Sequence, residues 1–309
     1  MKACQIAIAG LAACVGALAA HGAPTAEPPQ AAAPVDNANL VTVKLLETSD
    51  LVVPGEEVVL LLQATIAKGW HTYWAGPSDT GFPLNPKWTL PEGWTVVKTE
   101  WPVPTRHTSP GDILDHVYEG QATLVVTLKA PPTAAAGQKA RIGVDVAWLA
   151  CQEACIPGHA KAEVELKVAP PGTKPTAVNN DPLMSARAAL AMPLLPGSPV
   201  ASGKLEEQDT GWVYRIRAGR AARIRFFPGP DCAAIPNLIQ EGDVAGTESV
   251  LTLDAKKGRA PRVQGIVQIV YPSDEKSGKP GMVKSFSIDT AEKRPAEPSA
   301  APDAAKPDR

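Results

Sequence analysis

Residues 139–169, KARIGVDVAWLACQEACIPGHAKAEVELKVA, contain two strand-like runs on either side of a pair of cysteines. Apolar and polar residues alternate over 139–149 and again over 161–169, and a period of two predicts half-buried β-strands. A Pro-Gly dipeptide follows the second cysteine and indicates a turn. The stretch therefore predicts two strands joined by a bend that carries Cys151 and Cys155.

The chain before this stretch continues the same pattern. Turn signals such as Pro54-Gly55 separate further runs of strand length and apolar or alternating character. These runs are LVTVKLLE (40–47), EVVLLLQATI (57–66), TVVKTEW (95–101) and QATLVVTLKA (121–130). Many short strands with frequent turns predict an antiparallel β-sandwich of immunoglobulin-like dimensions.

A second set of strands follows a short predicted helix. Asp181 is suited to cap this helix and Pro182 to occupy its first turn, ahead of LMSARAALAM. The strands after it are predicted at WVYRIRA (212–218), ARIRFFP (222–228), SVLTLDA (249–255), RVQGIVQIVY (262–271) and VKSFSID (283–289). The expected fold class is therefore all-β, with two immunoglobulin-like antiparallel sandwiches and a short helix that opens the second.

Stretches rich in Pro, Ala and charged residues bury little apolar surface and so mark tails and linkers. They divide the chain into a signal peptide (1–23), a flexible Pro/Ala-rich tail (24–38), an immunoglobulin-like domain with Cys151 and Cys155 (39–169), a linker (170–181), a second, smaller sandwich domain (182–289) and a disordered tail (290–309).

The N-terminus predicts export from the cytoplasm. Lys2 precedes an apolar run that ends in small residues, as in a cleavable signal peptide. Leu11-Ala12-Ala13-Cys14 also resembles a lipoprotein processing box, which would leave a lipid on Cys14 and attach the protein to the membrane. No other segment approaches the roughly 20 apolar residues needed to span a bilayer.

The composition excludes one broad class of partner. The chain has 309 residues, 44% of them hydrophobic, and a formal net charge of −2. It therefore lacks the basic excess of a nucleic-acid-binding protein. It is long enough for one or two ordinary cores.

The spacing of Cys151 and Cys155 allows three roles. On an extended strand the two residues would lie about 13 Å apart, but a tight turn brings them to roughly 6 Å, which is within disulfide reach. As a permanent staple the bond is worth only about 2 kcal/mol, because the closed loop is short. A structural disulfide is still the common fate of cysteines in exported proteins, and redox exchange is the second role.

Metal binding is the third role. His159 follows the cysteines at the same interval, and Cys151, Cys155 and His159 together would suit a soft ion such as Cu(I). The sequence supplies no fourth ligand nearby, so the default expectation is a site without metal. His107 and His116 are interpreted as local hydrogen-bonding residues, and Cys232 as a structural thiol.

Aromatic residues gather before the cysteines. Six of the seven tryptophans lie between Trp70 and Trp148. The stretch GWHTYWAGPSDTGFP (69–83) combines rings with Gly and Pro, which predicts a loop that covers a site. The candidate lid or lining residues are Trp70, His71, Tyr73, Trp74 and Trp148; the alternative is that these rings fill the core.

Several of these segments together resemble the periplasmic N-terminal region of the DsbD family of thiol:disulfide interchange reductases, in the branch of the copper-sensitivity suppressors. The motifs are WHTYWAGPSDTG (70–81), LPEGW (90–94), WPVPTRH (101–107), YEG (118–120), WLACQEACIP (148–157), RFFPGP (225–230) and GIVQIV (265–270). The resemblance covers roughly residues 40–290. Its most specific part is the tryptophan-flanked cysteine motif.

The resemblance implies a function in disulfide exchange, and by extension in cytochrome c biogenesis or copper tolerance. A membrane-embedded DsbD-type reductase would supply electrons to the dithiol of Cys151 and Cys155, which would pass them to periplasmic thioredoxin-like oxidoreductases without a cofactor. Cys155 would attack the partner disulfide and Cys151 would resolve the mixed intermediate. The rival functions are periplasmic Cu(I) binding and a non-catalytic interaction module with a structural disulfide.

Overall fold

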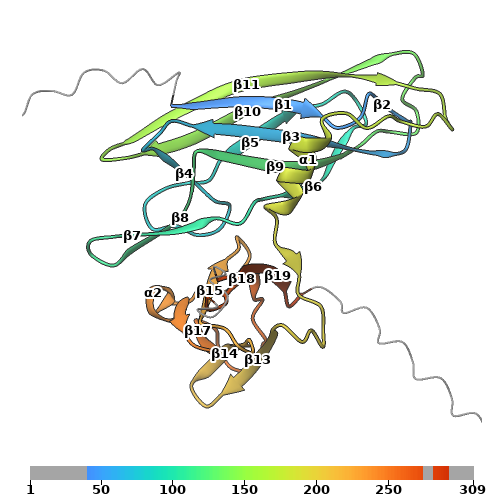
Figure 1. Ribbon diagram of the computed structural model, residues 1–309. Coiled ribbons are helices and arrows are strands. Elements are labelled where there is room, and N and C mark those ends of the chain that lie inside the picture. The colour runs from blue at the N-terminus through green and yellow to red at the C-terminus, as the bar shows by residue number, and fades with distance from the viewer. Residues whose placement is uncertain (1–39, 274–280, 292–309) are drawn as a thin grey trace, which may run out of the picture. The chain divides into compact units, whose positions relative to one another are not determined.

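The computed structural model of the protein describes residues 40–273 and 281–291 (Figure 1). The described residues belong to one compact unit. Within these ranges no helix combines the length and apolar character that a membrane span requires. The predicted signal peptide and N-terminal tail, together with Cys14, lie outside the described residues, as does the C-terminal tail beyond residue 291.

The first sandwich consists of two sheets. One has the strand order β1-β3-β9-β6, formed by β1 (Val41–Glu47), β3 (Glu57–Ile66), β9 (Gln121–Lys129) and β6 (Thr95–Glu100). The other has the order β2-β11-β10-β4-β8-β7, formed by β2 (Leu51–Val52), β11 (Cys155–Val168), β10 (Lys139–Cys151), β4 (His71–Tyr73), β8 (Ile113–Glu119) and β7 (Thr105–Ser109), while β5 (Asn85–Thr89) pairs with β10. The pairing is antiparallel except for the short β2–β11 contact.

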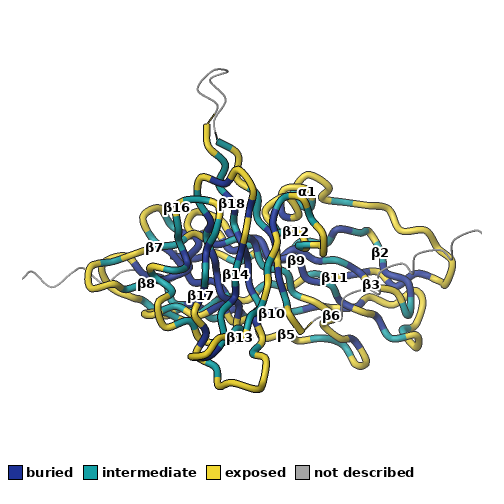
Figure 2. The backbone as a smooth tube through the Cα atoms, turned by 90° about the horizontal axis from the view of Figure 1, so that it is seen from below, coloured by how far each residue is buried: buried dark blue, intermediate teal, exposed yellow. Residues whose placement is uncertain are grey.

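The two sheets enclose one hydrophobic core. Figure 2 shows buried positions concentrated along the strands and exposed positions along the loops. In β10 every second residue is buried, because one face of this strand packs inward. The largest fully buried side chains of this core are Leu60, Leu62, Leu124, Leu128, Ile142, Trp148, Leu166 and Phe227. At about 2 kcal/mol for each large apolar side chain, this burial is the main favourable contribution to folding.

The second sandwich is smaller and has its own core. Its larger sheet contains β12 (Met192–Pro193), β19 (Val283–Asp289), β18 (Gln264–Val270), β15 (Arg223–Pro228) and β16 (Asp243–Ala245) in that order. Its smaller sheet contains β13 (Ser202–Gln208), β14 (Gly211–Arg217) and β17 (Glu248–Leu253), and a short helix α2 (Leu238–Glu241) precedes β16. The prediction of an all-β protein with two sandwiches is confirmed.

The helix predicted before the second sandwich is present as α1 (Asn180–Ala188). Its buried face packs on the first sandwich, where Ala186 meets Leu61 of β3 and Val125 of β9. The prediction that Asp181 caps this helix is wrong. Asn179, in a left-handed conformation, occupies the cap position; its side chain makes no capping hydrogen bond to the helix and instead donates to the carbonyl oxygen of Glu47 at 2.8 Å, and Asp181 lies in the first turn.

Two strands near the cysteines, β4 and β8, are absent from the sequence prediction. The stretch expected to be a loop at 69–83 contains β4, whose three residues are all buried. A three-residue strand is too short to produce a detectable period. In β8 the five residues from Leu114 to Tyr118 are all buried, so this strand shows no alternation either.

His116 of β8 lies in a buried, mainly aromatic environment. Its ring packs edge-on against Trp74 and Phe227. Its Nδ1–H donates to the carbonyl oxygen of Pro77 at 2.8 Å, and its Nε2 has no hydrogen-bond partner among the described residues. Burial lowers the pKa of His116 from 6.5 to about 4, because the imidazolium form loses its hydration.

This environment predicts acid sensitivity. Between pH 6.5 and 4 the unfolded chain binds a proton at His116 that the folded chain does not, so stability falls as the pH falls through this window. We expect a loss of about 2 kcal/mol in the free energy of unfolding between pH 7.5 and 5 from this residue. Urea unfolding at both pH values measures the loss.

The His116→Gln variant should lack this part of the pH dependence. His159→Gln is the matched control, because the His159 side chain is 66% exposed. If His116→Gln and the wild type lose the same free energy of unfolding on acidification, the proposed titration of His116 is wrong.

Candidate functional site

Cys151 and Cys155 form a disulfide at the end of a hairpin. Cys151 is the last residue of β10 and Cys155 the first residue of β11, and the two are paired across the strands with a Cα–Cα distance of 4.1 Å. Only Gln152, Glu153 and Ala154 separate them. The sequence prediction that a turn brings the sulfur atoms within bonding distance is confirmed.

The two sulfur-bearing residues differ in accessibility. Cys151 is 3% exposed and belongs to a small cluster with Tyr73, Val117 and Leu149. Cys155 is an exposed residue. Because disulfide exchange requires an in-line approach to a sulfur atom, Cys155 offers the accessible sulfur and Cys151 the protected one.

Strand β4 positions two side chains beside Cys151. His71 is paired with Cys151 in the sheet. Tyr73 lies two residues further along β4, so its side chain emerges on the same face as that of His71. The Tyr73 hydroxyl donates a hydrogen bond to Cys151 Sγ at 3.0 Å and lies 3.9 Å from Cys155 Sγ.

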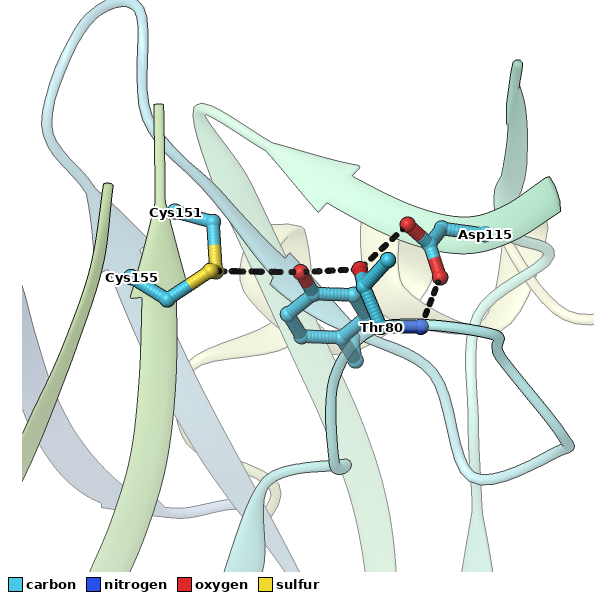
Figure 3. Close-up of a disulfide and its surroundings, with 5 residues drawn as sticks. Thr80, Asp115, Cys151 and Cys155 are labelled. Carbon is cyan, nitrogen blue, oxygen red and sulfur yellow. Dashed lines mark hydrogen bonds between the residues drawn. A yellow bond between two sulfur atoms is a disulfide. The ribbon is translucent and has the colours of Figure 1, made fainter. Parts of the chain in front are cut away.

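A row of hydrogen bonds continues from Tyr73 through Thr80 to the carboxylate of Asp115; Figure 3 labels Thr80, Asp115 and the two cysteines. The Tyr73 hydroxyl lies 3.1 Å from Thr80 Oγ1. Thr80 Oγ1 donates to Asp115 Oδ2 at 2.6 Å, and the Thr80 backbone N–H donates to Asp115 Oδ1 at 3.0 Å. Asp115 is 3% exposed, so its carboxylate depends on these donors for compensation of its lost hydration.

The number of hydroxyl protons in this row leaves the Tyr73 hydroxyl two possible acceptors. Thr80 has one hydroxyl proton, and the short bond to Asp115 uses it. The contact between Tyr73 and Thr80 therefore requires the phenolic proton, which can point either to Thr80 Oγ1 or to Cys151 Sγ. Asp115 fixes the orientation of Thr80 and thereby the alternative acceptor of Tyr73.

The segment that carries Thr80 is held against β8. The Ser78 hydroxyl accepts from the His116 backbone N–H at 3.1 Å. The Asp79 carboxylate accepts from the Leu114 N–H at 2.7 Å. Gly81 packs flat on the Tyr73 ring, where a Cβ atom would lie 2.1 Å from the ring carbons. The segment covers Tyr73 and leaves no room for a larger residue at Gly81.

The electrostatic environment keeps both β4 side chains in their neutral forms near pH 7. Burial raises the pKa of Tyr73, so the phenol retains its proton and remains a donor. Burial, and then the nearby His107, lower the pKa of His71. The His71 and His107 rings lie 5.0 Å apart, and His71 also contacts the Tyr73 ring edge-on.

The candidate lining residues do not all lie at the disulfide. His71 and Tyr73 are next to Cys151, as described above. Trp148 and Trp74 are 2% and 4% exposed and belong to the hydrophobic core, and Trp70 packs against the same core. The structure therefore brings two of the five proposed lining residues to the cysteines and places the three tryptophans in core positions.

The copper alternative finds little support in the geometry. His159 lies on β11, paired with Ala147, and its Nδ1 is 3.2 Å from Asp145 Oδ1. Four residues of extended strand place it about 13 Å along the chain from Cys155. In the parts of the chain that the structure describes, no group of three or more His, Cys, Asp or Glu side chains is arranged to hold a metal ion.

Sequence reasoning did not identify Thr80, Asp115 and His107 as residues of this site. Thr80 lies in the GPSDTG turn, which has no catalytic signature. Asp115 and His107 face each other in the β7–β8 hairpin. The one available signal was Asp115-His116 inside the apolar run ILDHVYE, since buried polar residues need partners.

A comparison with known protein families finds a match for the stretch that contains this site. Residues 42–167 match the family model described as "Thiol:disulfide interchange protein DsbD, N-terminal". This stretch includes the whole hairpin with Cys151 and Cys155. The resemblance to the DsbD N-terminal region, predicted from the sequence motifs, is confirmed for residues 42–167. No curated protein matches the sequence.

Among the solved structures that are similar to the chain, two N-terminal domains are 14% identical to it. The N-terminal periplasmic domain of ScsB from Proteus mirabilis is 14% identical, with 80% of this chain and 91% of that chain covered and a TM-score of 0.47. The N-terminal domain of Neisseria meningitidis DsbD in the reduced form is also 14% identical, with 44% and 88% covered and a TM-score of 0.25.

Proposed function

We propose that this protein is a thiol:disulfide exchange module of the periplasm, because residues 42–167 match the family model of DsbD N-terminal regions. Its Cys151–Cys155 pair accepts two electrons from a membrane-embedded reductase of the DsbD type. It then passes them to thioredoxin-like oxidoreductases. No cofactor takes part, since the two sulfur atoms carry the electrons.

The exchange proceeds in two balanced steps. In the first, the Cys155 thiolate attacks one sulfur of the partner disulfide, which forms a mixed disulfide and releases one partner thiolate. In the second, the Cys151 thiolate attacks Cys155 Sγ, closes the intramolecular disulfide and releases the second partner thiolate. The partner gains two electrons and, in water, two protons.

The observation that carries this proposal is the hydrogen bond from Tyr73 to the buried sulfur of Cys151, beside an exposed Cys155. A neutral phenol stabilises a thiolate at Cys151 as that residue becomes the leaving group during reduction. A permanent structural disulfide has no need of such a donor. The asymmetry also supports Cys155 as the attacking thiol and Cys151 as the resolving thiol.

The hydrogen bond that the Tyr73 hydroxyl donates depends on the oxidation state of the Cys151–Cys155 pair. A disulfide sulfur is a weak acceptor, so Tyr73 can share its proton with Thr80 Oγ1. A thiolate at Cys151 is a far stronger acceptor, and hydrogen bonds to charged groups contribute about 1.5–3 kcal/mol. Tyr73 therefore favours the state in which Cys151 is reduced and charged.

The reduction potential of the pair tests the proposal. The protein is equilibrated with thiol buffers of defined potential, and the dithiol fraction is counted by alkylation and mass analysis. We expect a value between about −270 and −120 mV, the range of exchange proteins. A value below about −300 mV would identify a structural disulfide and an interaction module instead.

A second measurement addresses the copper alternative. The reduced protein is titrated with Cu(I), and the same titration is made on His159→Ala. Weak binding that His159→Ala leaves unchanged agrees with the exchange function. Tight stoichiometric binding that is lost in His159→Ala would favour a Cu(I) site formed by Cys151, Cys155 and His159.

A further inference from the structure

The β7–β8 hairpin has two functional faces. Its register pairs Arg106 with His116 and His107 with Asp115. Because successive side chains point to opposite faces of a sheet, the first pair emerges on one face and the second pair on the other. The two strands of this hairpin, β7 and β8, can be followed in Figure 1.

The face with His107 and Asp115 contacts the disulfide site. His107 lies 5.0 Å from His71, the residue paired with Cys151. Asp115 holds Thr80 through two hydrogen bonds. A displacement of the hairpin would therefore disturb the orientation of Thr80, and with it the contact that holds the Tyr73 hydroxyl beside Cys151 Sγ.

The face with Arg106 and His116 contacts the second sandwich. The Arg106 guanidinium donates to four backbone carbonyl oxygens: Gly242 at 3.2 Å, Leu238 and Ile239 at 3.3 Å, and Phe226 at 3.5 Å. The His116 ring lies 5.5 Å from the Phe227 ring. A planar group with five donors fits such a set of carbonyls better than a lysine ammonium would.

The segment that carries Thr80 reaches the second sandwich as well. A Cβ atom at Gly76 would lie 2.1 Å from the carbonyl oxygen of Pro228, so the two backbones are in close contact. Trp74, next to Tyr73 in the chain, packs edge-on against Phe227. Both supports of Thr80, the hairpin and its own segment, therefore rest on the second sandwich, through β15 and through helix α2 with the residue that follows it.

We propose that Arg106 is a positioning residue for disulfide exchange. Through its four carbonyl bonds the second sandwich fixes the β7–β8 hairpin where Asp115 can orient Thr80 and Tyr73 toward Cys151. The second sandwich thus tunes the reactivity of a disulfide that belongs to the first. This inference rests on the proposed exchange function and assigns a role in it to the second sandwich.

The test uses the full chain and dithiothreitol as the probe. A dithiothreitol thiolate first attacks Cys155 Sγ, and Cys151 leaves as a thiolate. The second thiol of the same dithiothreitol molecule then attacks the dithiothreitol sulfur of the mixed disulfide, which forms cyclic oxidised dithiothreitol and releases Cys155 as a thiolate. We expect Arg106→Gln to lower the second-order rate constant about fivefold, within the range of such coupling effects. Arg106→Lys, which keeps the charge but loses the fork of donors, should fall between Arg106→Gln and the wild type.

Two controls separate positioning from general destabilisation. Arg262→Gln removes the same charge from the second sandwich, where Arg262 bonds to Asp231 and Asp289, and should leave the rate constant unchanged. Thr80→Val should itself slow reduction, because the Tyr73 hydroxyl then loses the contact with Thr80 Oγ1 that holds it beside Cys151 Sγ. In that background Arg106→Gln should have no further effect, because the row of hydrogen bonds is already broken.

Two results would overturn the inference: an unchanged rate constant in Arg106→Gln, or a fivefold effect that persists in the Thr80→Val background. If Arg106→Gln does not fold, the same comparison is made with Arg106→Lys, for which an unchanged rate constant is also decisive. The exchange function is judged separately, by the reduction potential of the wild type. A potential in the exchange range together with an insensitive Arg106 would refute only the role of the second sandwich.

Discussion

Cys151→Ala is expected to react with an aromatic disulfide reagent on the order of 100-fold faster than Cys155→Ala. In Cys151→Ala the remaining thiol is the exposed Cys155. In Cys155→Ala it is Cys151, which is 3% exposed and lies beneath Tyr73. A reagent reaches that sulfur only when the site opens locally, and an opening free energy of about 3 kcal/mol reduces the rate by this factor. Stopped-flow absorbance measures both rates.

The same asymmetry predicts which variant accumulates an intermediate. Cys151→Ala should retain a mixed disulfide through Cys155 when mixed with an oxidised thioredoxin-like protein, because no resolving thiol remains. Cys232→Ala in each background is the control, since this residue is a free cysteine and burial raises the pKa of its thiol. If only Cys155→Ala retains the intermediate, the roles of the two cysteines are reversed.

The sheet framework was largely predictable from the sequence, for a physical reason. The strands β1, β3, β9, β10 and β11 are long enough for their period of two, or their apolar content, to appear in the sequence. The site was less predictable. It depends on β4, which has three residues, and on β8, which is buried over five consecutive residues. Neither shows a period.

The cysteine pair and its chemistry were predictable because both cysteines lie in one short turn. The residues that tune them come from three separate segments: Tyr73 from β4, Thr80 from the following loop and Asp115 from β8. Sequence distance conceals such a group, since Tyr73 and Cys151 are 78 residues apart. Only the pairing of β4 between β10 and β8 brings them together.

Tyr73→Phe should slow the reduction of the disulfide by dithiothreitol about tenfold. The variant keeps the ring that packs on Gly81 but loses the donor to Cys151 Sγ. A hydrogen bond to a charged group contributes about 1.5–3 kcal/mol, and part of the thiolate charge has developed on Cys151 in the transition state. In the reduced protein the pKa of the Cys151 thiol should rise, because the thiolate loses its hydrogen-bond partner. The pH dependence of alkylation measures this pKa.

Tyr118→Phe is the matched control for this change. Tyr118 is also a buried tyrosine of the same sheet, and its hydroxyl donates to the carbonyl oxygen of Pro102 at 2.7 Å, not to a sulfur atom. Both variants lose one buried hydrogen bond, so both should lose roughly 1 kcal/mol in the free energy of unfolding. Only Tyr73→Phe should change the rate of reduction and the thiol pKa. Equal rates for the two variants would mean that Tyr73 supports the fold alone and that the buried sulfur receives no chemical assistance.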